Sequence, residues 1–266
     1  MTSASSADVL NRNEIVSIIN ELRRGWDQFL ETDLELTRPR DATITTVAPS
    51  VVGLASHVTA LARAVVTLLD HSANELVAMP LIREAFEGAI TAHWLTQVPD
   101  GMQAFAAEYE RKRTALATDL QRAQSAPFRA GANMVAAQVL PVKPSKSTSQ
   151  ARNFSQMCED LALAGVDAYV YYRLASEQSH PSMLVVDQYF DNGKDGIELR
   201  IVPRTTVADS GWLFLTAASV VWAHMAVNYC DAPRRRRSEL RAIARRLQIE
   251  PELKLSDAAW NRLNKK

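Results

Sequence analysis

Apolar residues recur at spacings of three and four along much of this chain, and that pattern predicts helices. One face of residues 8–30 carries Leu10, Ile15, Ile18, Ile19, Leu22, Trp26 and Phe29. Residues 48–70 repeat the pattern with Arg63 as the single charge before Asp70, so we expect this second helix near the middle of a bundle. The amino-terminal part of the chain is therefore predicted to be helical.

The helical pattern continues beyond residue 70 and has recognisable ends. A third helix is expected over residues 74–97, with Asn74 as its N-cap and a kink or a late start at Pro80. A fourth covers 102–124 and is charged on one face. Two more follow over 153–165 and 166–180, the first closed by Gly165 and the second by Pro181.

Three segments depart from this pattern. Residues 126–150 mix Pro, Gly, Ser and Lys, which predicts a long surface connection. Within residues 184–202 the apolar residues change from helical spacing to the shorter spacing of strands, on both sides of the turn sequence "DNGKDG". This pattern favours a small β-hairpin. Helix returns over 207–229, and two short helices follow. We predict an all-α fold: a multi-helix bundle domain over 1–232 with that hairpin, and a short basic C-terminal helical extension over 233–266.

Composition supports a helical protein, and the motifs that the sequence lacks exclude several classes of function. The chain has 266 residues, 47% of them hydrophobic, and only 9 glycines. Its two cysteines, Cys158 and Cys230, have neither disulfide-framework nor zinc-site spacing, so we predict no metal, no cofactor and a reducing cytoplasmic location. The sequence shows no Gly-rich phosphate loop, Rossmann fingerprint, nucleophile elbow or HExxH motif, and its start lacks the pattern of a secretion signal.

Residues 211–229 form a run of 19 residues without a formal charge, followed by arginines. That length and that flanking charge also suit a membrane span. His224 and Asn228 argue against a span, because polar side chains are costly in lipid. We therefore expect a buried central helix and no membrane, and keep the span as the alternative.

Charge is distributed unevenly along the chain. Residues 234–266 carry eleven Lys or Arg and four Asp or Glu, so the acidic remainder balances a basic tail. Such a tail can bind RNA phosphates by counterion release, or lie on the acidic body of the protein. The candidate nucleic-acid contacts are Arg234, Arg235, Arg236, Arg237 and Arg241.

The stretch "YYRLASEQSHPSM" concentrates the candidate chemistry. Arg173 and His180 are two helical turns apart, and Ser176 lies between them on the same stripe. A histidine can move protons near neutral pH and an arginine can hold a phosphate oxygen, a combination suited to phosphodiester chemistry. The alternative is an ordinary helix end, in which Arg173 pairs with Glu177 and the other two side chains bond backbone carbonyls.

A second polar group lies on the predicted third helix. Arg83 and Glu87 are four residues apart on a strongly apolar helix, where they could form a buried ion pair that fixes helix register. If this helix faces residues 166–180, the pair could instead meet Arg173, Ser176 and His180 in one polar pocket.

Both sets of polar residues resemble the motifs of a known family. They resemble an all-helical bacterial family of unknown function over roughly residues 50–190, through the motifs R-x-x-x-E at Arg83 and Glu87 and Y-x-x-x-S-x-x-x-H at Tyr172, Ser176 and His180. This resemblance implies a helical fold and suggests that the two groups belong to one site. It does not supply an activity.

A looser likeness is to the HEPN superfamily, whose ribonuclease members place an arginine a few residues before a histidine near a helix end. "RLASEQSH" has this order, although Leu174 stands where those enzymes have a polar residue. The resemblance implies a homodimer that cleaves RNA without metal. His180 would be the general acid or base, Arg173 the phosphate clamp and Ser176 an orienting hydroxyl, while Arg83, Glu87 and Tyr172 would support them. The alternative function is a non-catalytic helical protein-interaction module.

Overall fold

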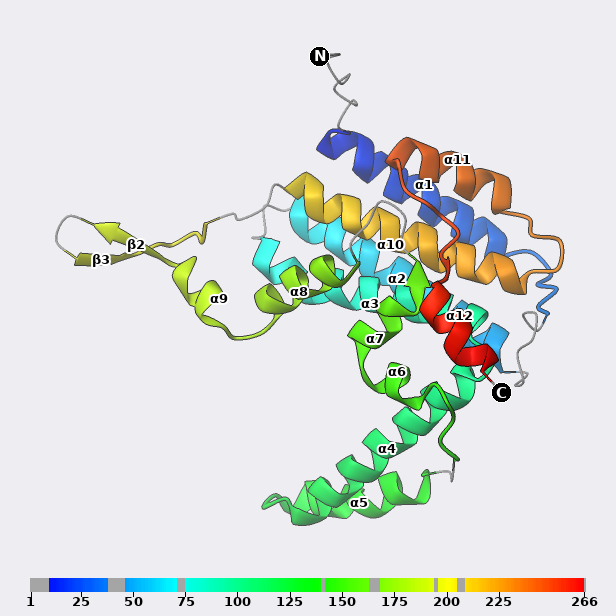
Figure 1. The fold of residues 1–266 in the computed structure, drawn as a ribbon. Helices are drawn as coiled ribbons and strands as arrows, with labels where there is room; N and C mark the ends of the chain where they lie inside the picture. Colours follow the sequence, from blue (N-terminus) through cyan, green and yellow to red (C-terminus); the bar gives the residue numbers. More distant parts are fainter. Residues whose placement is uncertain are drawn as a thin grey trace.

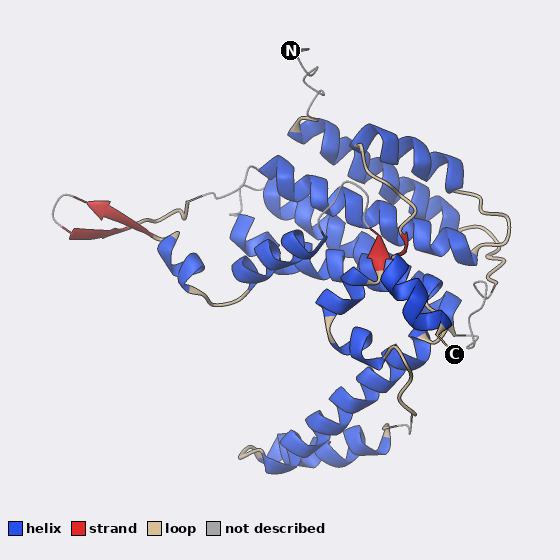
Figure 2. Ribbon diagram, viewed as in Figure 1, coloured by secondary structure: helices blue, strands red, loops and turns tan. Residues whose placement is uncertain are grey.

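The predicted all-α architecture is confirmed by a computed structural model, which describes residues 10–37, 46–70, 75–139, 142–162, 168–193, 196–204 and 209–265. Helices dominate the described chain, and strands are few and short (Figure 2). Asn74 and Gly165, the predicted helix caps, lie outside the described residues.

The core of the bundle is built by three helices, α2 (Val47–Asp70), α3 (Glu75–Gln97) and α10 (Asp209–Cys230), which pack against one another. The helix α1 (Arg12–Leu30) lies on α10 and buries all of its predicted apolar face from Ile15 to Phe29. It begins in a capping box in which Asn11 and Glu14 bond each other's backbone N–H groups. Pro80 lies inside α3 without ending it.

The apolar helix α10 occupies the centre of the protein. Two helices, Val47–Asp70 and Ser210–Cys230, are long and apolar enough to cross a membrane by length and composition alone, which is also true of core helices in soluble proteins. Most of the apolar window of the second is buried by surrounding helices. This environment matches the buried central helix expected for residues 211–229.

Residues 126–150 are not the long surface connection that their composition predicts. Ala126–Ala137 form helix α5, which folds back along α4 (Gly101–Arg122), and the short helix α6 begins at Thr148 and ends at Arg152. Ser125 precedes α5 in extended conformation, a proline follows in the first turn, and alanines fill the rest. The turn-forming residues are concentrated between the two helices. Figure 1 shows α4 and α5 projecting together from the bundle.

The predicted hairpin is present but shorter than residues 184–202. Strands β2 (Phe190–Gly193) and β3 (Gly196–Leu199) pair antiparallel, with Phe190 opposite Leu199. The preceding residues form a helical turn instead, α9 (Met183–Asp187), because the Ser182 side chain accepts a bond from Val185 N and caps it. The hairpin and α9 extend away from the bundle as an arm (Figure 1).

The C-terminal segment is packed into the same core as the rest of the chain. Helix α11 (Arg237–Leu247) buries Leu240, Ile243, Ala244 and Leu247. Strand β4 (Lys254–Leu255) pairs with β1 (Leu161–Ala162), which follows helix α7 (Phe154–Glu159), and α12 (Asp257–Asn264) ends the described chain. Whether residues 1–232 fold without this segment stays a prediction.

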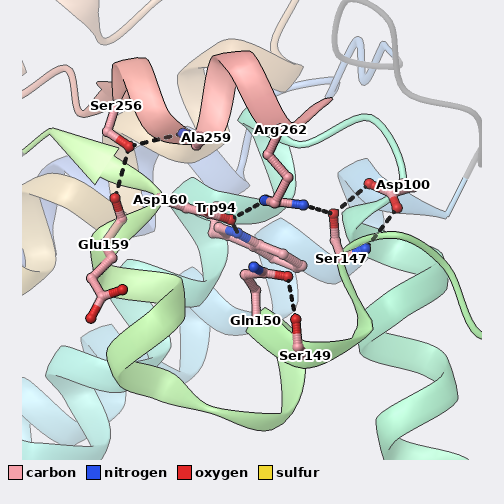
Figure 3. Close-up of polar contacts among 10 residues, drawn as sticks. All are labelled: Trp94, Asp100, Ser147, Ser149, Gln150, Glu159, Asp160, Ser256, Ala259 and Arg262. Carbon is pink, nitrogen blue, oxygen red and sulfur yellow. Dashed lines mark hydrogen bonds and ion pairs between the residues drawn. The ribbon is translucent and has the colours of Figure 1, made fainter. Parts of the chain in front are cut away.

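Polar side chains fasten α12 to the bundle (Figure 3). Arg262 donates to Asp160 Oδ2 at 2.6 Å, and the buried Trp94 indole donates to the same oxygen at 2.9 Å. Arg262 also reaches Ser147 Oγ at 3.0 Å, and that hydroxyl donates to Asp100 at 2.7 Å. Burial raises the pKa of the Asp160 carboxyl. The hydrogen bonds from Trp94 and Arg262 lower it, but the effect of burial is larger.

Candidate active site

Helix α3 supplies a half-buried ion pair. Ile82, Phe86 and Ile90 anchor the helix in the core, which leaves Arg83 and Glu87 on its flank. Arg83 Nε donates to Glu87 Oε1 at 2.6 Å, and the two side chains are 19% and 27% exposed. A guanidinium held in this way presents its remaining N–H groups in a fixed direction.

Helix α8 (Ala168–Ser179) lies across α3 and ends beside that pair. Its Tyr172 places an aromatic ring 5.3 Å from the Arg83 guanidinium carbon, within the range of a cation–π contact. The Tyr172 ring also packs against Phe154 of α7, at a centroid separation of 4.8 Å. Tyr172 therefore joins the Arg83 guanidinium to the aromatic packing between α7 and α8.

His180 follows the last residue of α8, at the corner where the chain turns into α9. Pro181 stops the helix there, and Ser182 Oγ bonds the Glu177 carbonyl at 2.8 Å across the corner. His180 is exposed to solvent. Its Nε2 atom forms a hydrogen bond with Nη1 of Arg83.

This contact sets the role of one imidazole nitrogen. A guanidinium can only donate hydrogen bonds, so Nε2 of His180 is the acceptor in its contact with Arg83. Arg83 thus bonds Glu87 through Nε and His180 through Nη1, while its guanidinium carbon lies over the Tyr172 ring. These contacts bring Arg83 and Glu87 together with Tyr172 and His180 in one cluster, the arrangement that the family resemblance suggests.

Arg173, the predicted phosphate clamp, points elsewhere. Its Nη2 bonds Glu177 Oε1 at 3.3 Å, and the two side chains are 62% and 51% exposed. This is the ion pair that the helix-end alternative anticipates. Ser176 is half-buried on α8, one turn before His180. The structure therefore places Arg83, rather than Arg173, against the histidine.

Four of the five candidate nucleic-acid arginines, Arg235, Arg236, Arg237 and Arg241, form contacts within the chain. Arg237 and Arg241 both bond Glu252 Oε1, at 3.0 and 2.6 Å. Although burial raises the pKa of Glu252, these two guanidinium groups hold it below its usual value. Arg235 bonds the Asp33 carbonyl at 2.9 Å, while Arg234 lies on the exposed surface. RNA binding by these residues stays a prediction.

Arg236 is the most buried of these arginines. It forms a bidentate pair with Glu239, at 3.0 and 2.8 Å, and bonds His224 Nδ1 at 3.0 Å. His224 Nε2 bonds Thr59 Oγ1 at 2.9 Å, and its ring stacks on Trp26. This network joins α1, α2, α10 and α11, so its evident role is to hold the bundle together.

Four other titratable side chains are buried, and burial moves their pKa values away from neutrality. Burial lowers the pKa of His93 to about 4, and burial together with Arg236 lowers that of His224 well below its usual value. Burial also raises the pKa of both thiols, Cys158 and Cys230, to about 12. Among the described residues, no group of three His, Cys, Asp or Glu side chains could hold a metal ion.

Some of the polar framework was missed by sequence reasoning. Asp160, Arg262, Ser147 and Asp100 come from four separate segments, and none of their spacings points to the others. The one available signal is Asp160 itself, a carboxylate next to the apolar run "LALAG". A charge beside an apolar run needs a partner when the chain folds.

Comparison with known proteins places the chain in a family. The family model described as a family of unknown function (DUF5677) matches residues 50–197, more than half of the chain, so the chain belongs to that family. The match includes both helices of the Arg83–His180 cluster and confirms the resemblance drawn from the two motifs. No curated protein and no solved structure matches the chain. The HEPN likeness receives no support from these comparisons and stays a prediction.

Proposed function

We propose that this member of a family of unknown function is a metal-independent ribonuclease, in which His180 moves the proton and Arg83 holds the phosphate. The observation that supports it is the hydrogen bond between these two side chains, which come from different helices. An accessible imidazole can accept a proton, and a guanidinium beside it can stabilise charge on a phosphate. Phosphodiester transfer requires both of these roles. The HEPN likeness points to the same activity but assigns the clamp to Arg173.

The free protein holds the two groups together, and a substrate phosphate would separate them. A phosphate oxygen is a stronger acceptor for Arg83 than a neutral imidazole, because it carries charge. Once Arg83 turns its Nη1 to the phosphate, His180 Nε2 has a free lone pair beside the bound group. Substrate binding therefore releases the base at the place where it is needed.

The reaction that fits these groups is internal transesterification. His180 Nε2 takes the proton of the ribose 2′-hydroxyl, and the 2′-oxygen attacks the adjacent phosphorus. The bond from phosphorus to the 5′-oxygen breaks, and that oxygen takes a proton from solvent. The products are a 2′,3′-cyclic phosphate and a free 5′-hydroxyl. Arg83 stabilises the charge that develops on the phosphoryl oxygens.

Glu87 and Tyr172 are positioning residues in this scheme. Glu87 bonds Nε of Arg83, which leaves the Nη groups for the phosphate, and the Tyr172 ring contacts the guanidinium. Figure 1 shows α11 well separated from α8, so the arginines of the basic tail do not line this site. Any contact that they make with RNA would involve a strand extending across the protein.

The second candidate function is the non-catalytic interaction module. It is favoured by the arm of α9, β2 and β3, which exposes Met183, Val186, Ile197 and Leu199. Large exposed apolar side chains gathered on one element are typical of binding surfaces. In this case the Arg83–Glu87 pair would only fix the packing of α8 on α3.

An RNA-cleavage assay distinguishes the two candidate functions. We expect the pure protein to cut single-stranded RNA in the presence of EDTA and to leave 2′,3′-cyclic phosphate ends, detected by mass spectrometry. His180→Gln keeps a side chain of similar size and should lower the rate about 10²–10⁴-fold, because it removes the proton acceptor. DNA of the same sequence should stay intact, since it lacks the 2′-hydroxyl. Equal cleavage by both proteins, or no cleavage by either, would reject the ribonuclease.

A further inference from the structure

The arm formed by α9, β2 and β3 has little of its own to fold against. In the part of the chain that the structure describes, β3 pairs with β2 alone, and the pair stands away from the bundle (Figure 1). An isolated two-stranded hairpin is marginally stable in water, and further strands or a packing surface stabilise it. The arm would therefore be stabilised by pairing with a further strand or by packing on another protein surface.

The two faces of the hairpin differ in polarity. Cross-strand pairing puts Phe190 beside Leu199 on one face, together with Ile197. Ile197, Leu199 and the following Ile201 are 75%, 72% and 97% exposed. On the other face Asp191 bonds Arg200 at 2.5 Å. One face is thus apolar and uncovered, and the other is charged.

The open edge of β3 has a defined set of backbone groups. Arg200 N–H donates to the Tyr189 carbonyl at 2.7 Å, so the backbone of Arg200 faces β2. Inward and outward residues alternate along an antiparallel strand. The N–H and C=O groups of Ile197 and Leu199 therefore face outward, and they are free to pair with another strand.

We propose that this edge binds a second copy of the same chain, β3 against β3 in antiparallel register about Leu199. The sequence "IELRI" at residues 197–201 is what makes the edge self-complementary. Pairing about Leu199 puts Glu198 opposite Arg200 of the second copy, and Arg200 opposite its Glu198, so both charge contacts are attractive. Ile197 meets Ile201 in the same register.

The symmetry and the surface both fit a homodimer. A contact that repeats itself through a twofold axis closes after two copies, so it gives a discrete dimer with one four-stranded sheet. Beside the apolar face lies a groove of about 530 Å³ whose lining combines apolar residues, among them Met183 and Ile197, with charged ones, among them Asp187 and Arg204. The apolar part of this groove lies next to the paired edges. The proposal does not rest on ribonuclease activity.

Cysteine cross-linking tests the register. In the proposed dimer the two Leu199 Cα atoms lie about 5.5 Å apart, a separation that a disulfide can bridge. The two Ile201 positions lie four residues out of register, about 13 Å apart. Leu199→Cys should therefore form linked dimers at least about tenfold faster than Ile201→Cys under mild oxidation, although Ile201 is the more exposed of the two. Equal rates would overturn the proposal.

A charge exchange tests the pairing without cysteine. Glu198 lies directly opposite Asp191 within one hairpin, so Glu198→Arg places an attractive pair there and does not weaken the arm. Between copies the introduced guanidinium faces Arg200 of the other chain at both symmetry-related contacts, and we expect the dimer dissociation constant to rise about tenfold. The double variant Glu198→Arg/Arg200→Glu restores opposite charges and should restore the dimer.

Sedimentation equilibrium of wild type and both variants measures this effect. The proposal predicts a dimer for wild type, a weaker one for Glu198→Arg, and recovery for the double variant. Circular dichroism of each protein checks that the helical bundle is unchanged. A wild type that stays monomeric at the highest soluble concentration, or a single variant that dimerises as well as wild type, would refute the β3 interface.

Discussion

Arg83→Ala should reduce RNA cleavage by about 10²–10³-fold, because it removes the cation that contacts the phosphate in the transition state. The same substitution at Arg173 should leave the rate within about threefold, since that side chain is largely exposed and pairs with Glu177. The comparison is well matched. Each arginine lies four residues before a glutamate on a helix and bonds it, and only Arg83 reaches His180.

The two variants are compared in kcat/KM on one RNA substrate, with thermal denaturation as a check on folding. Arg83→Lys should recover part of the loss, since it retains charge but not the fork geometry that bonds two partners. A large loss for Arg173→Ala with little effect of Arg83→Ala would contradict this site. That result would instead favour the spacing of Arg173 and His180 read directly from the sequence.

Asp160→Ala should destabilise the fold more than any change at an exposed ion pair, by about 3 kcal/mol. It removes the shared acceptor of the Arg262 guanidinium and the Trp94 indole (Figure 3). Trp94 is fully buried, so its N–H would lose its bond in a place that water does not reach. Arg262 would lose its ion pair and keep only the hydrogen bond to Ser147.

Urea denaturation measures the change, and two variants serve as controls. Asp160→Asn keeps an oxygen acceptor for Trp94 and should cost less than Asp160→Ala. Glu177→Ala removes an exposed partner and should change the free energy of unfolding by less than about 1 kcal/mol. If Asp160→Ala costs no more than Glu177→Ala, the network in Figure 3 contributes little to the stability of the fold.

Hydrophobic periodicity predicts the bundle well because the periodic faces are buried as expected. The residues from Ile15 to Phe29 that define the first helix are all in the core, and the apolar residues 211–229 lie within the central helix. In both cases burial of a continuous apolar surface dominates the outcome. Such a pattern can be read without knowledge of the neighbouring helices.

Periodicity fails where local capping decides the structure. Residues 126–137 contain Pro and Gly and look like a loop, yet Pro127 lies in the first turn of α5, where a proline is tolerated. The apolar run 183–186 looks like a strand, but it forms the helical turn α9 behind Ser182. The β1–β4 pair joins residues far apart in sequence, so no local pattern announces it.

The sequence predicted the members of the candidate site but left open whether the two helices that carry them meet. Arg83, Glu87, Tyr172 and His180 could each be named, because charged and aromatic residues stand out on apolar helices. Spacing along one helix favoured Arg173 as the partner of His180. The actual partner depends on how α8 crosses α3, which is set by tertiary packing and leaves no trace in either helix alone.

The tautomer of His180 tests the Arg83–His180 contact most directly. At alkaline pH, where histidine rings are neutral, a long-range ¹H–¹⁵N correlation spectrum distinguishes a ring protonated on Nδ1 from one protonated on Nε2. We predict the Nδ1–H form for His180 in the wild type, because Nε2 accepts from Arg83, and a shift toward the Nε2–H form in Arg83→Ala. An Nε2–H ring in the wild type, unchanged by Arg83→Ala, would contradict the contact on which the proposed site depends.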